Sequence, residues 1–106
     1  MTTTNALQFP ISEAPAMGQP LQVAEGVYWL RMPLPFALNH INLWLLEDHL
    51  GWTIVDTGIN TSACKELWQQ VFDHHLNNKP VHQLIVTHLH PDHVGLAGWI
   101  CERWGL

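Results

Sequence analysis

The pattern of apolar and polar residues predicts three strands in the first half of the chain. Apolar positions from Leu21 to Leu30 indicate a first strand that contains a turn at Glu25-Gly26. The run from Asn39 to Leu46 predicts a second strand, and Trp52 to Val55 predicts a third, because both are rich in apolar and β-branched residues. The polar segment Glu47 to Gly51 joins them as a hairpin turn. We expect the second and third strands to form the centre of a sheet.

The second half of the chain predicts a helix, a strand and another helix. Val81 to Val86 reads as a fourth strand whose last three residues, Leu84-Ile85-Val86, are apolar enough to be buried. The last helix is expected over Val94 to Trp104. The helix before the fourth strand follows Asn60 or Thr61, either of which can act as its N-cap. Its apolar residues recur at helical spacing: Cys64, Leu67, Trp68, Val71, Phe72 and Leu76.

Proline and glycine refine these boundaries. Met32 to Phe36 contains two prolines, which lack an amide donor, so we predict a loop there and not a strand. Gly95 and Gly98 are unusual inside a helix and are expected to permit close approach of the backbone to the loop after the fourth strand, which holds the candidate metal ligands, or to a neighbouring strand. Residues 1–20 show little periodicity and hold three prolines. We therefore predict a poorly ordered arm over residues 1–20 and a domain over residues 21–106.

Composition narrows the class of partner. The chain of 106 residues can hold one small domain, and its hydrophobic content of 47% fits a globular core. A formal net charge of −5 with only four Lys and Arg argues against binding to nucleic acid or to an anionic membrane, since both depend on clustered cations. Six Trp are more than a domain of this size readily covers, which indicates a surface that packs against another segment or chain.

Neither the cysteines nor the N-terminus indicates an exported protein. Cys64 and Cys101 both fall in expected helices, where they are interpreted as buried apolar residues and not as disulfide partners or ligands. The N-terminus lacks the cationic start and apolar run of a signal peptide, and no apolar stretch is long enough to span a bilayer. We therefore expect a cytoplasmic location.

Four side chains able to bind a metal fall within six residues directly after the fourth strand. In an extended segment His88 and His90 would emerge on the same side and converge on one ion, with Leu89 turned into the core. Pro91 suits a turn, after which the pair Asp92-His93 would point in another direction. We therefore predict one metal at His88 and His90 and a second at Asp92-His93, with the ions about 3.5–4 Å apart.

Two segments resemble the metallo-β-lactamase superfamily. Thr87-His88-Leu89-His90-Pro91-Asp92-His93-Val94-Gly95 looks like its signature, and Ile54-Val55-Asp56-Thr57-Gly58 looks like its preceding strand and turn. The resemblance implies the α+β class and a four-layer αββα sandwich. Residues 23–106 would form about its N-terminal half, a mixed β-sheet with two helices. The family pattern also has a further His for the first metal, a bridging Asp and a last His, all of them downstream.

The resemblance implies roles for five residues. His88 and His90 would bind the first metal, and Asp92 and His93 the second, with Asp92 also orienting the nucleophile as the catalytic residue. Asp56 would orient the metal ligands from behind, since a carboxylate buried at a strand end needs partners. A turn-forming role for Asp56, bonded to nearby backbone amides, stays open. Zinc, up to two ions, is the default metal, although iron or manganese also suits these donors.

By the same resemblance the protein would be a metal-dependent hydrolase in which metal-activated water attacks a small thioester, lactam or ester-like substrate. Two ligands per ion fall short of the roughly three protein ligands usual at a catalytic zinc. We therefore expect the chain alone to be incomplete and weakly active or inactive. His40, His49 or His82 is a further candidate for completing the first ligand set. Leu34 and Phe36 would either form a substrate wall or anchor a connection.

A second hypothesis comes from another functional class. The chain could be a non-catalytic metal-binding half-domain that completes its fold by self-association, as a homo-oligomer, or by pairing with a complementing C-terminal half. A half-sandwich exposes an apolar sheet face and an unpaired edge, and both favour association.

Overall fold

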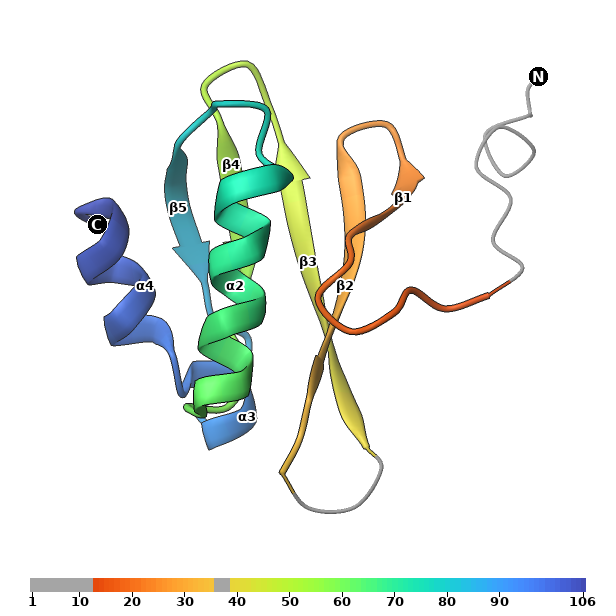
Figure 1. Cartoon of the computed structure of the whole chain (residues 1–106). Helices are drawn as coiled ribbons and strands as arrows, with labels where there is room; N and C mark the ends of the chain where they lie inside the picture. The colour runs from red at the N-terminus through yellow and green to blue at the C-terminus, as the bar shows by residue number, and fades with distance from the viewer. Residues whose placement is uncertain (1–12, 36–38) are drawn as a thin grey trace.

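A mixed five-stranded sheet organises the molecule. The computed structural model describes residues 13–35 and 39–106. The strands lie in the order β1-β2-β3-β4-β5, antiparallel as far as β4 and parallel between β4 and β5 (Figure 1). Their bounds are β1 Leu21–Ala24, β2 Val27–Pro33, β3 His40–Glu47, β4 Trp52–Val55 and β5 Val81–Ile85. The expected mixed sheet is confirmed, with β3 at its centre.

The first strand of the prediction is in fact two strands. Glu25-Gly26 forms the turn of a β1–β2 hairpin, and Gly26 needs its positive φ of 73° there. The predicted loop over Met32 to Phe36 is wrong at its start, because β2 continues through Met32 and Pro33. The carbonyl of Arg31 accepts a bond from Gly18 on the side away from β3. Pro33, two residues later, faces the same side, so its missing amide donor breaks no bond to β3. Phe36 lies outside the described residues.

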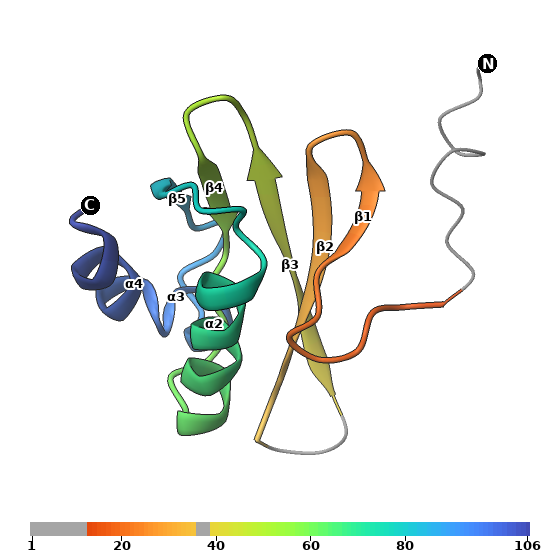
Figure 2. The ribbon, with the colours of Figure 1, turned by 45° about the horizontal axis from the view of Figure 1, so that its top comes forward.

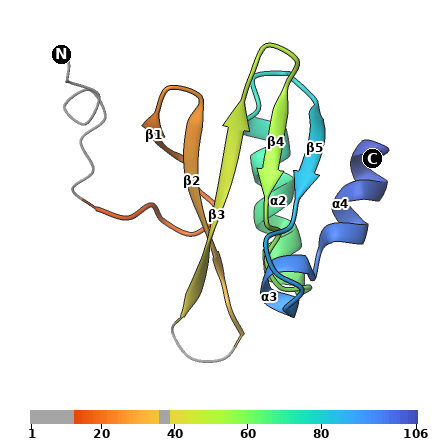
Figure 3. The same cartoon turned by 180° about the vertical axis from the view of Figure 1, so that it is seen from behind.

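One helix covers one face of the sheet. The α2 helix (Ser62–His74) begins after Thr61, whose side chain accepts a bond from the backbone amide of Cys64. Its buried face packs on the alternate residues of β2, β3 and β4 that point toward it. The view from behind shows the helix on the far side of the sheet (Figure 3). The buried Trp52 and Trp68 indoles donate to the carbonyls of Leu76 and Thr57, at 2.8 and 2.7 Å. The largest core residues are Trp52, Trp68, Leu30, Met32, Leu43, Leu45 and Ile54.

The expected last helix is broken into two. The short α3 (Pro91–Val94) and the longer α4 (Ala97–Trp104) are separate elements. Both follow β5, and α4 leads to the C-terminus (Figure 2). The backbone amide of Leu96 donates to the hydroxyl of Thr57 at 3.0 Å, which takes it out of a continuous helix. Gly95 does approach other backbone closely, but the neighbours are Gly58 and Asn60 in the segment between β4 and α2, and not a strand or the loop after β5. Gly98 has no atom within 4 Å of an added Cβ, so that prediction is wrong.

The opposite face of the sheet carries no helix among the described residues (Figure 3). Trp29 and Trp44 stack on it with ring centroids 6.2 Å apart. Ile85 is 42% exposed, so the prediction that Leu84-Ile85-Val86 is a fully buried strand is wrong. Strand β5 lies at the sheet edge, and only the side that faces the helices is covered. The other partly buried apolar residues that alternate onto this face are Val27, Leu46 and Val55.

Part of the predicted N-terminal arm lies against the domain. Pro15 and Gly18 are buried, and a Cβ on Gly18 would meet the side chain of Leu67 on α2 at 2.7 Å. Residues 1–12 are outside the described range, so the boundary at residue 20 stays a prediction. None of the helices in the described ranges has the length and hydropathy needed to cross a membrane.

Candidate metal centre

The candidate site forms where β4 and β5 end side by side. Asp56 follows β4 directly, and its backbone amide donates to the carbonyl of Ile85 at 2.8 Å. Asp56 has a positive φ of 66°, a conformation that Asp and Asn adopt more readily than most residues. This turn directs its carboxylate at the loop after β5. Thr87, in that loop, is the first residue it meets.

Asp56 is the hub of the site. Its Oδ1 accepts from the backbone amide of Thr87 at 2.7 Å, and its Oδ2 accepts from the Thr87 hydroxyl at 2.6 Å. Oδ2 also lies 3.0 Å from Nδ1 of His93, although Asp56 itself is only 4% exposed. Burial acts most strongly on the Asp56 pKa and raises it. The Thr87 hydroxyl and amide and the His93 ring together outweigh burial, so the net pKa is lowered and Asp56 is ionised at neutral pH.

The ionised Asp56 assigns the tautomers of two histidines. A carboxylate only accepts, so Nδ1 of His93 carries the proton that faces Asp56. The Thr87 hydroxyl donates its one proton to Asp56, so the Thr87 oxygen accepts a bond from Nδ1 of His88, at 2.8 Å. Both rings, when neutral, therefore keep the lone pair on Nε2. Nε2 is the atom that each ring has free for a metal.

The structure brings together part of the predicted ligand set. His88, His93 and Asp56 each place a ligand atom within 4.8 Å of the others, and the His88 and His93 rings have centroids 4.6 Å apart. His90 and Asp92 fall outside this cluster. The His90 ring stacks at 6.2 Å from His88, and Oδ2 of Asp92 lies 3.7 Å from Nε2 of His93.

The expected geometry of the motif needs two corrections. Strand β5 ends at Ile85, so strand alternation does not set the directions of His88 and His90. Leu89 is 90% exposed and does not enter the core, because the residues after β5 form a projecting loop. The assignment of His88, His90, Asp92 and His93 as metal ligands stays a prediction, as does the catalytic role of Asp92.

The remaining histidines considered for the first ligand set have other neighbours. Nδ1 of His40 lies 2.6 Å from Nη2 of Arg31, and Nε2 of His82 lies 3.2 Å from Oδ2 of Asp48. His49 is exposed in the β3–β4 turn. Within the described ranges, none of the three joins the cluster of Asp56, His88 and His93.

Sequence reasoning named Thr87 only as the first residue of the signature and gave it no role in the site. It contacts Asp56 twice and His88 once, so it links the two residues, and Thr57 ties the same region to α3 through the carbonyl of His93 at 2.9 Å. A hydroxyl residue directly before the first His of the motif is the available signal for Thr87. Thr57 gives no such signal, because the contacts that tie it to this region are to backbone atoms 36 and 39 residues away.

The donors present fit a metal of the zinc type. Two neutral imidazoles share one cluster, and each has its Nδ1 already engaged and its Nε2 free. Asp56 belongs to the same cluster, but it lies against Nδ1 of His93 and not on the side of the free Nε2. Both of its oxygens already accept bonds from Thr87 or face His93, an arrangement that favours the orienting role.

Comparison with known proteins agrees with a metal-binding α+β domain. The family model of the metallo-beta-lactamase superfamily matches residues 37–106, more than half of the chain. The chain therefore belongs to the metallo-β-lactamase superfamily. The expected α+β fold of that family is confirmed by solved structures that superpose on most of this chain. Proteins of this superfamily typically bind metal ions, and one relative of this chain is described as a probable metallo-hydrolase.

Three relatives illustrate the relationship. The chain is 33% identical over 73 residues to the probable metallo-hydrolase YqjP of Bacillus subtilis (strain 168). The aligned region covers 68% of this chain and 23% of that protein. It is 54% identical to a β-lactamase domain protein from Burkholderia ambifaria, with a TM-score of 0.83 over 91% of this chain and 29% of that one. A metallo-β-lactamase family protein from Thermus thermophilus is 32% identical, with a TM-score of 0.64 over 74% of this chain and 27% of that one. The chain thus spans less than a third of each relative.

Proposed function

We propose that this chain carries the metal-binding part of a metal-dependent hydrolase that acts on a small thioester, lactam or ester-like substrate. The observation that carries the proposal is the cluster of His88, His93 and Asp56 at the end of β4 and β5 in a member of the metallo-β-lactamase superfamily. The similarity to a probable metallo-hydrolase supports the same reaction class.

Each residue of the site has a task under this proposal. His88 and His93 offer Nε2, and His90 and Asp92 lie beside them as the remaining donors. Asp56 and Thr87 fix the two rings through Nδ1, which prevents the imidazoles from rotating or exchanging tautomers. The Asp56 carboxylate is therefore expected to act through His88 and His93 and not on the substrate.

A bound metal would supply an electrophile that lowers the pKa of water and polarises the scissile carbonyl. Asp92 is the residue of this chain best placed to orient the attacking water and accept its proton, because it is partly exposed and 3.7 Å from Nε2 of His93. Zinc as the metal, with up to two ions, belongs to the proposal, as do a cytoplasmic location and the two-metal arrangement.

Zinc binding and turnover test the proposal separately. We expect the isolated chain to bind zinc, measured by competition with a chromophoric chelator, and to hydrolyse thioester and lactam substrates weakly or not at all. Low turnover is expected because the described residues supply few donors per ion. A chain that binds no zinc would contradict the proposed function. Metal-dependent hydrolysis by the monomeric chain would contradict the expected incompleteness of the site.

The uncovered sheet face favours a second candidate function, a non-catalytic half-domain that pairs with itself or with a complementing C-terminal half. Trp29 and Trp44 stack on that face, and Ile85 is 42% exposed at its edge. Gel filtration with light scattering, with and without zinc, tests this candidate. Concentration-dependent dimers would support pairing, and a monomer at all concentrations would contradict self-association.

A further inference from the structure

Arg31 and His40 form a second cluster of polar side chains, separate from the candidate metal centre. Arg31 lies in β2 and His40 begins β3, where the register pairs Arg31 with Asn42 and Pro33 with His40. The two side chains are diagonal neighbours on one face of the hairpin, and Nη2 of Arg31 lies 2.6 Å from Nδ1 of His40. A guanidinium only donates, so Nδ1 of His40 accepts and Nε2 carries the ring proton. The pair therefore presents only donors to its surroundings.

Within residues 13–35 and 39–106, no carboxylate forms an ion pair with Arg31 or His40. Residues 1–12 and 36–38, which the structure does not describe, contain no Asp or Glu. Strand β2 has no acidic residue, and the only one in β3 is Glu47, at the far end, which pairs with Lys79 at 3.0 Å. A positive charge without a counter-charge is therefore built into a chain whose net charge is negative.

The donors of Arg31 are also poorly satisfied. Nη1 reaches the carbonyl of Pro15 only at 3.4 Å, and the buried Nε has no acceptor among the described residues. The buried Nε is closed to a ligand, so an oxygen anion with two or more acceptor atoms would bind the outer nitrogens, Nη1 and Nη2. Arg31 is only partly buried, so its outer donors can meet a ligand.

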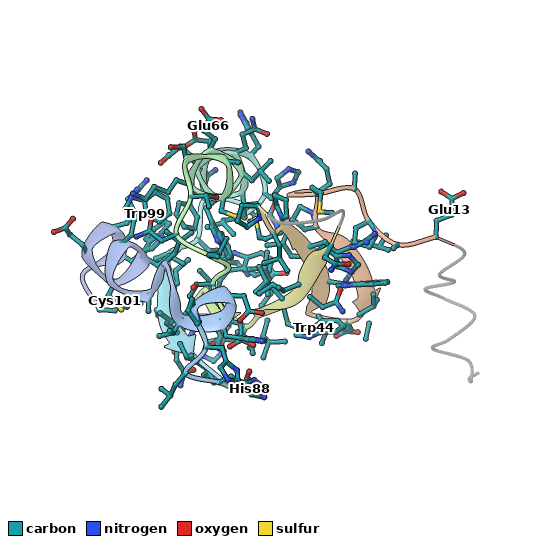
Figure 4. The ribbon with its side chains drawn as sticks, turned by 90° about the horizontal axis from the view of Figure 1, so that it is seen from below. Glu13, Trp44, Glu66, His88, Trp99 and Cys101 are labelled. Atoms are coloured by element: carbon teal, nitrogen blue, oxygen red, sulfur yellow. The ribbon has the colours of Figure 1, made fainter. Side chains whose placement is uncertain are left out.

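The pair lies on the same side of the sheet as the candidate metal centre. Arg31, His40 and Trp44 alternate onto the face away from α2. Figure 4, viewed along the strands, shows Trp44 and His88 on that side, whereas Glu66 of α2 lies on the opposite side. His40 lies beyond the last β3–β4 pair, Trp44 with Val55, which is the end of the sheet at which Asp56 follows β4. A ligand on this face could therefore extend from one cluster toward the other.

We propose that Arg31 and His40 bind an oxyanion, the carboxylate or phosphate group of a small molecule. Arg31 supplies the charge and a planar fork of donors, and His40 supplies Nε2–H beside it. The interpretation of this ligand as the substrate rests on the proposed hydrolase function. In that case the substrate is a compound with an anionic group away from the scissile bond.

Direct titration of the metal-free chain tests the site without any assay of hydrolysis. Inorganic phosphate and, separately, acetate are added at constant chloride concentration, and the side-chain NMR signals of Arg31 and His40 are followed. We expect saturable shifts of both residues with at least one of the two anions. The anion that binds with the higher affinity shows whether the site prefers phosphate or carboxylate. Signals that do not move with either anion would overturn the proposal.

Substitutions separate binding by this pair from general charge effects. Arg31→Gln is expected to weaken anion binding about tenfold or more, and Arg31→Lys, which keeps the charge but loses the fork, to weaken it less. The matched control is Arg103→Gln, because Arg103 lies over Phe72 and Trp104 at the end of α4. Equal binding by the wild type, Arg31→Gln and Arg31→Lys chains would overturn the proposal, even if all three bind.

Zinc titration of the same variants distinguishes failure of this site from failure of the proposed function. Arg31→Gln is expected to bind zinc as the wild type does, since Arg31 has no contact with Asp56, His88 or His93. Anion binding in a chain that binds no zinc would leave the oxyanion site standing and contradict the hydrolase. Zinc binding without anion binding would overturn the oxyanion site alone.

Discussion

Asp56 and Thr87 determine how two histidines are presented to solvent. The Asp56 carboxylate is buried, yet its pKa is lowered, because the bonds from Thr87 and the contact with His93 outweigh the effect of burial. The same bonds place protons on Nδ1 of His88 and His93 and leave Nε2 of both rings free. Ligand orientation in this site is thus set by residues that need not touch a metal.

Thr87→Val is the sharpest test of this arrangement. Valine keeps the shape and the backbone amide, but it removes the hydroxyl that donates to Asp56 and accepts from His88. We expect zinc affinity to fall about 10–100-fold, as is typical when a residue behind a ligand is lost. Chelator competition measures the change. Thr53→Val is the matched control, since its hydroxyl contacts only Gln83 within the sheet. Unchanged affinity in Thr87→Val would contradict the role assigned to Thr87.

At this scale the sequence contained the donors but not their grouping. His88, His90, Asp92 and His93 are visible as a motif because they are neighbours along the chain. The grouping of His88 with His93, and not with His90, depends on the end of β5 at Ile85 and on contacts to Asp56, 31 or more residues earlier. Spacing alone does not encode such long-range contacts.

Among the elements, the junction between α3 and α4 is closely packed at Gly95. Gly95 has an ordinary helical φ of −55°, but an added Cβ would collide with the carbonyl oxygen of Pro91 and would lie 2.9 Å from the amide of Asn60. Gly98, inside α4, faces open space. Gly95 is therefore needed for close packing and Gly98 is not, although both lie in the segment predicted as one helix.

Gly95→Ala and Gly98→Ala make a matched pair. Gly95→Ala is expected to lower the free energy of unfolding by about 1–3 kcal/mol, because backbone atoms cannot yield to the new methyl group. Gly98→Ala is expected to raise it by about 0.4–1 kcal/mol, since alanine restricts the unfolded chain and favours helix. Urea unfolding of both variants measures the difference. A Gly95→Ala chain as stable as Gly98→Ala would show that the junction is not close-packed.

The β3–β4 turn makes a pH-dependent contribution to stability. The pKa of Asp48 is lowered below its usual 3.8, first by the backbone amide of Leu50 and then by that of Gly51 and by His82, against the opposing effect of desolvation. A lowered folded pKa means that the charged form stabilises the fold above the usual pKa. This contribution is lost as the pH falls through the folded pKa.

Asp48→Asn isolates that charge, because asparagine keeps a side-chain oxygen for the amides of Leu50 and Gly51. We expect the wild type to be more stable than Asp48→Asn at about pH 6, and the difference to shrink at a pH below the lowered folded pKa of Asp48. Urea midpoints at both values of pH measure the effect. A difference that stays constant, or grows, on acidification would contradict the assignment.

The order of the elements could be predicted from the sequence, whereas two of their ends could not. Strand β4 and the Thr61 cap of α2 match the expectations, because apolar periodicity and N-cap chemistry are local signals. The break between α3 and α4 was not predicted, since it depends on the Thr57 hydroxyl taking the amide of Leu96, 39 residues away. The extension of β2 to Pro33 was missed because the sequence does not show which side of β2 faces β3. On the other side, the segment before β1 bonds to Arg31 through Gly18.

On the scale of the whole molecule, the two faces of the sheet differ. The α2 helix covers one face, and no helix of the described ranges covers the other (Figure 1). Trp68 of α2 is buried, whereas Trp29 and Trp44 stack on the uncovered face. The large number of Trp predicted a surface that packs against something else, but not which tryptophans would form it. His88 of the candidate metal centre lies on this second side in Figure 4, and the alternation of β2 and β3 directs Arg31 and His40 to the same side.

The account depends on one claim, that Asp56 and Thr87 hold His88 and His93 with Nε2 free for a metal. Long-range proton–nitrogen NMR of the histidine rings during a zinc titration tests it most directly. We predict that both rings carry their proton on Nδ1 before zinc is added, and that zinc shifts Nε2 of both together, with saturation at a fixed ratio of metal to chain. Protons found on Nε2, or zinc binding that leaves the His88 and His93 signals unmoved, would contradict it.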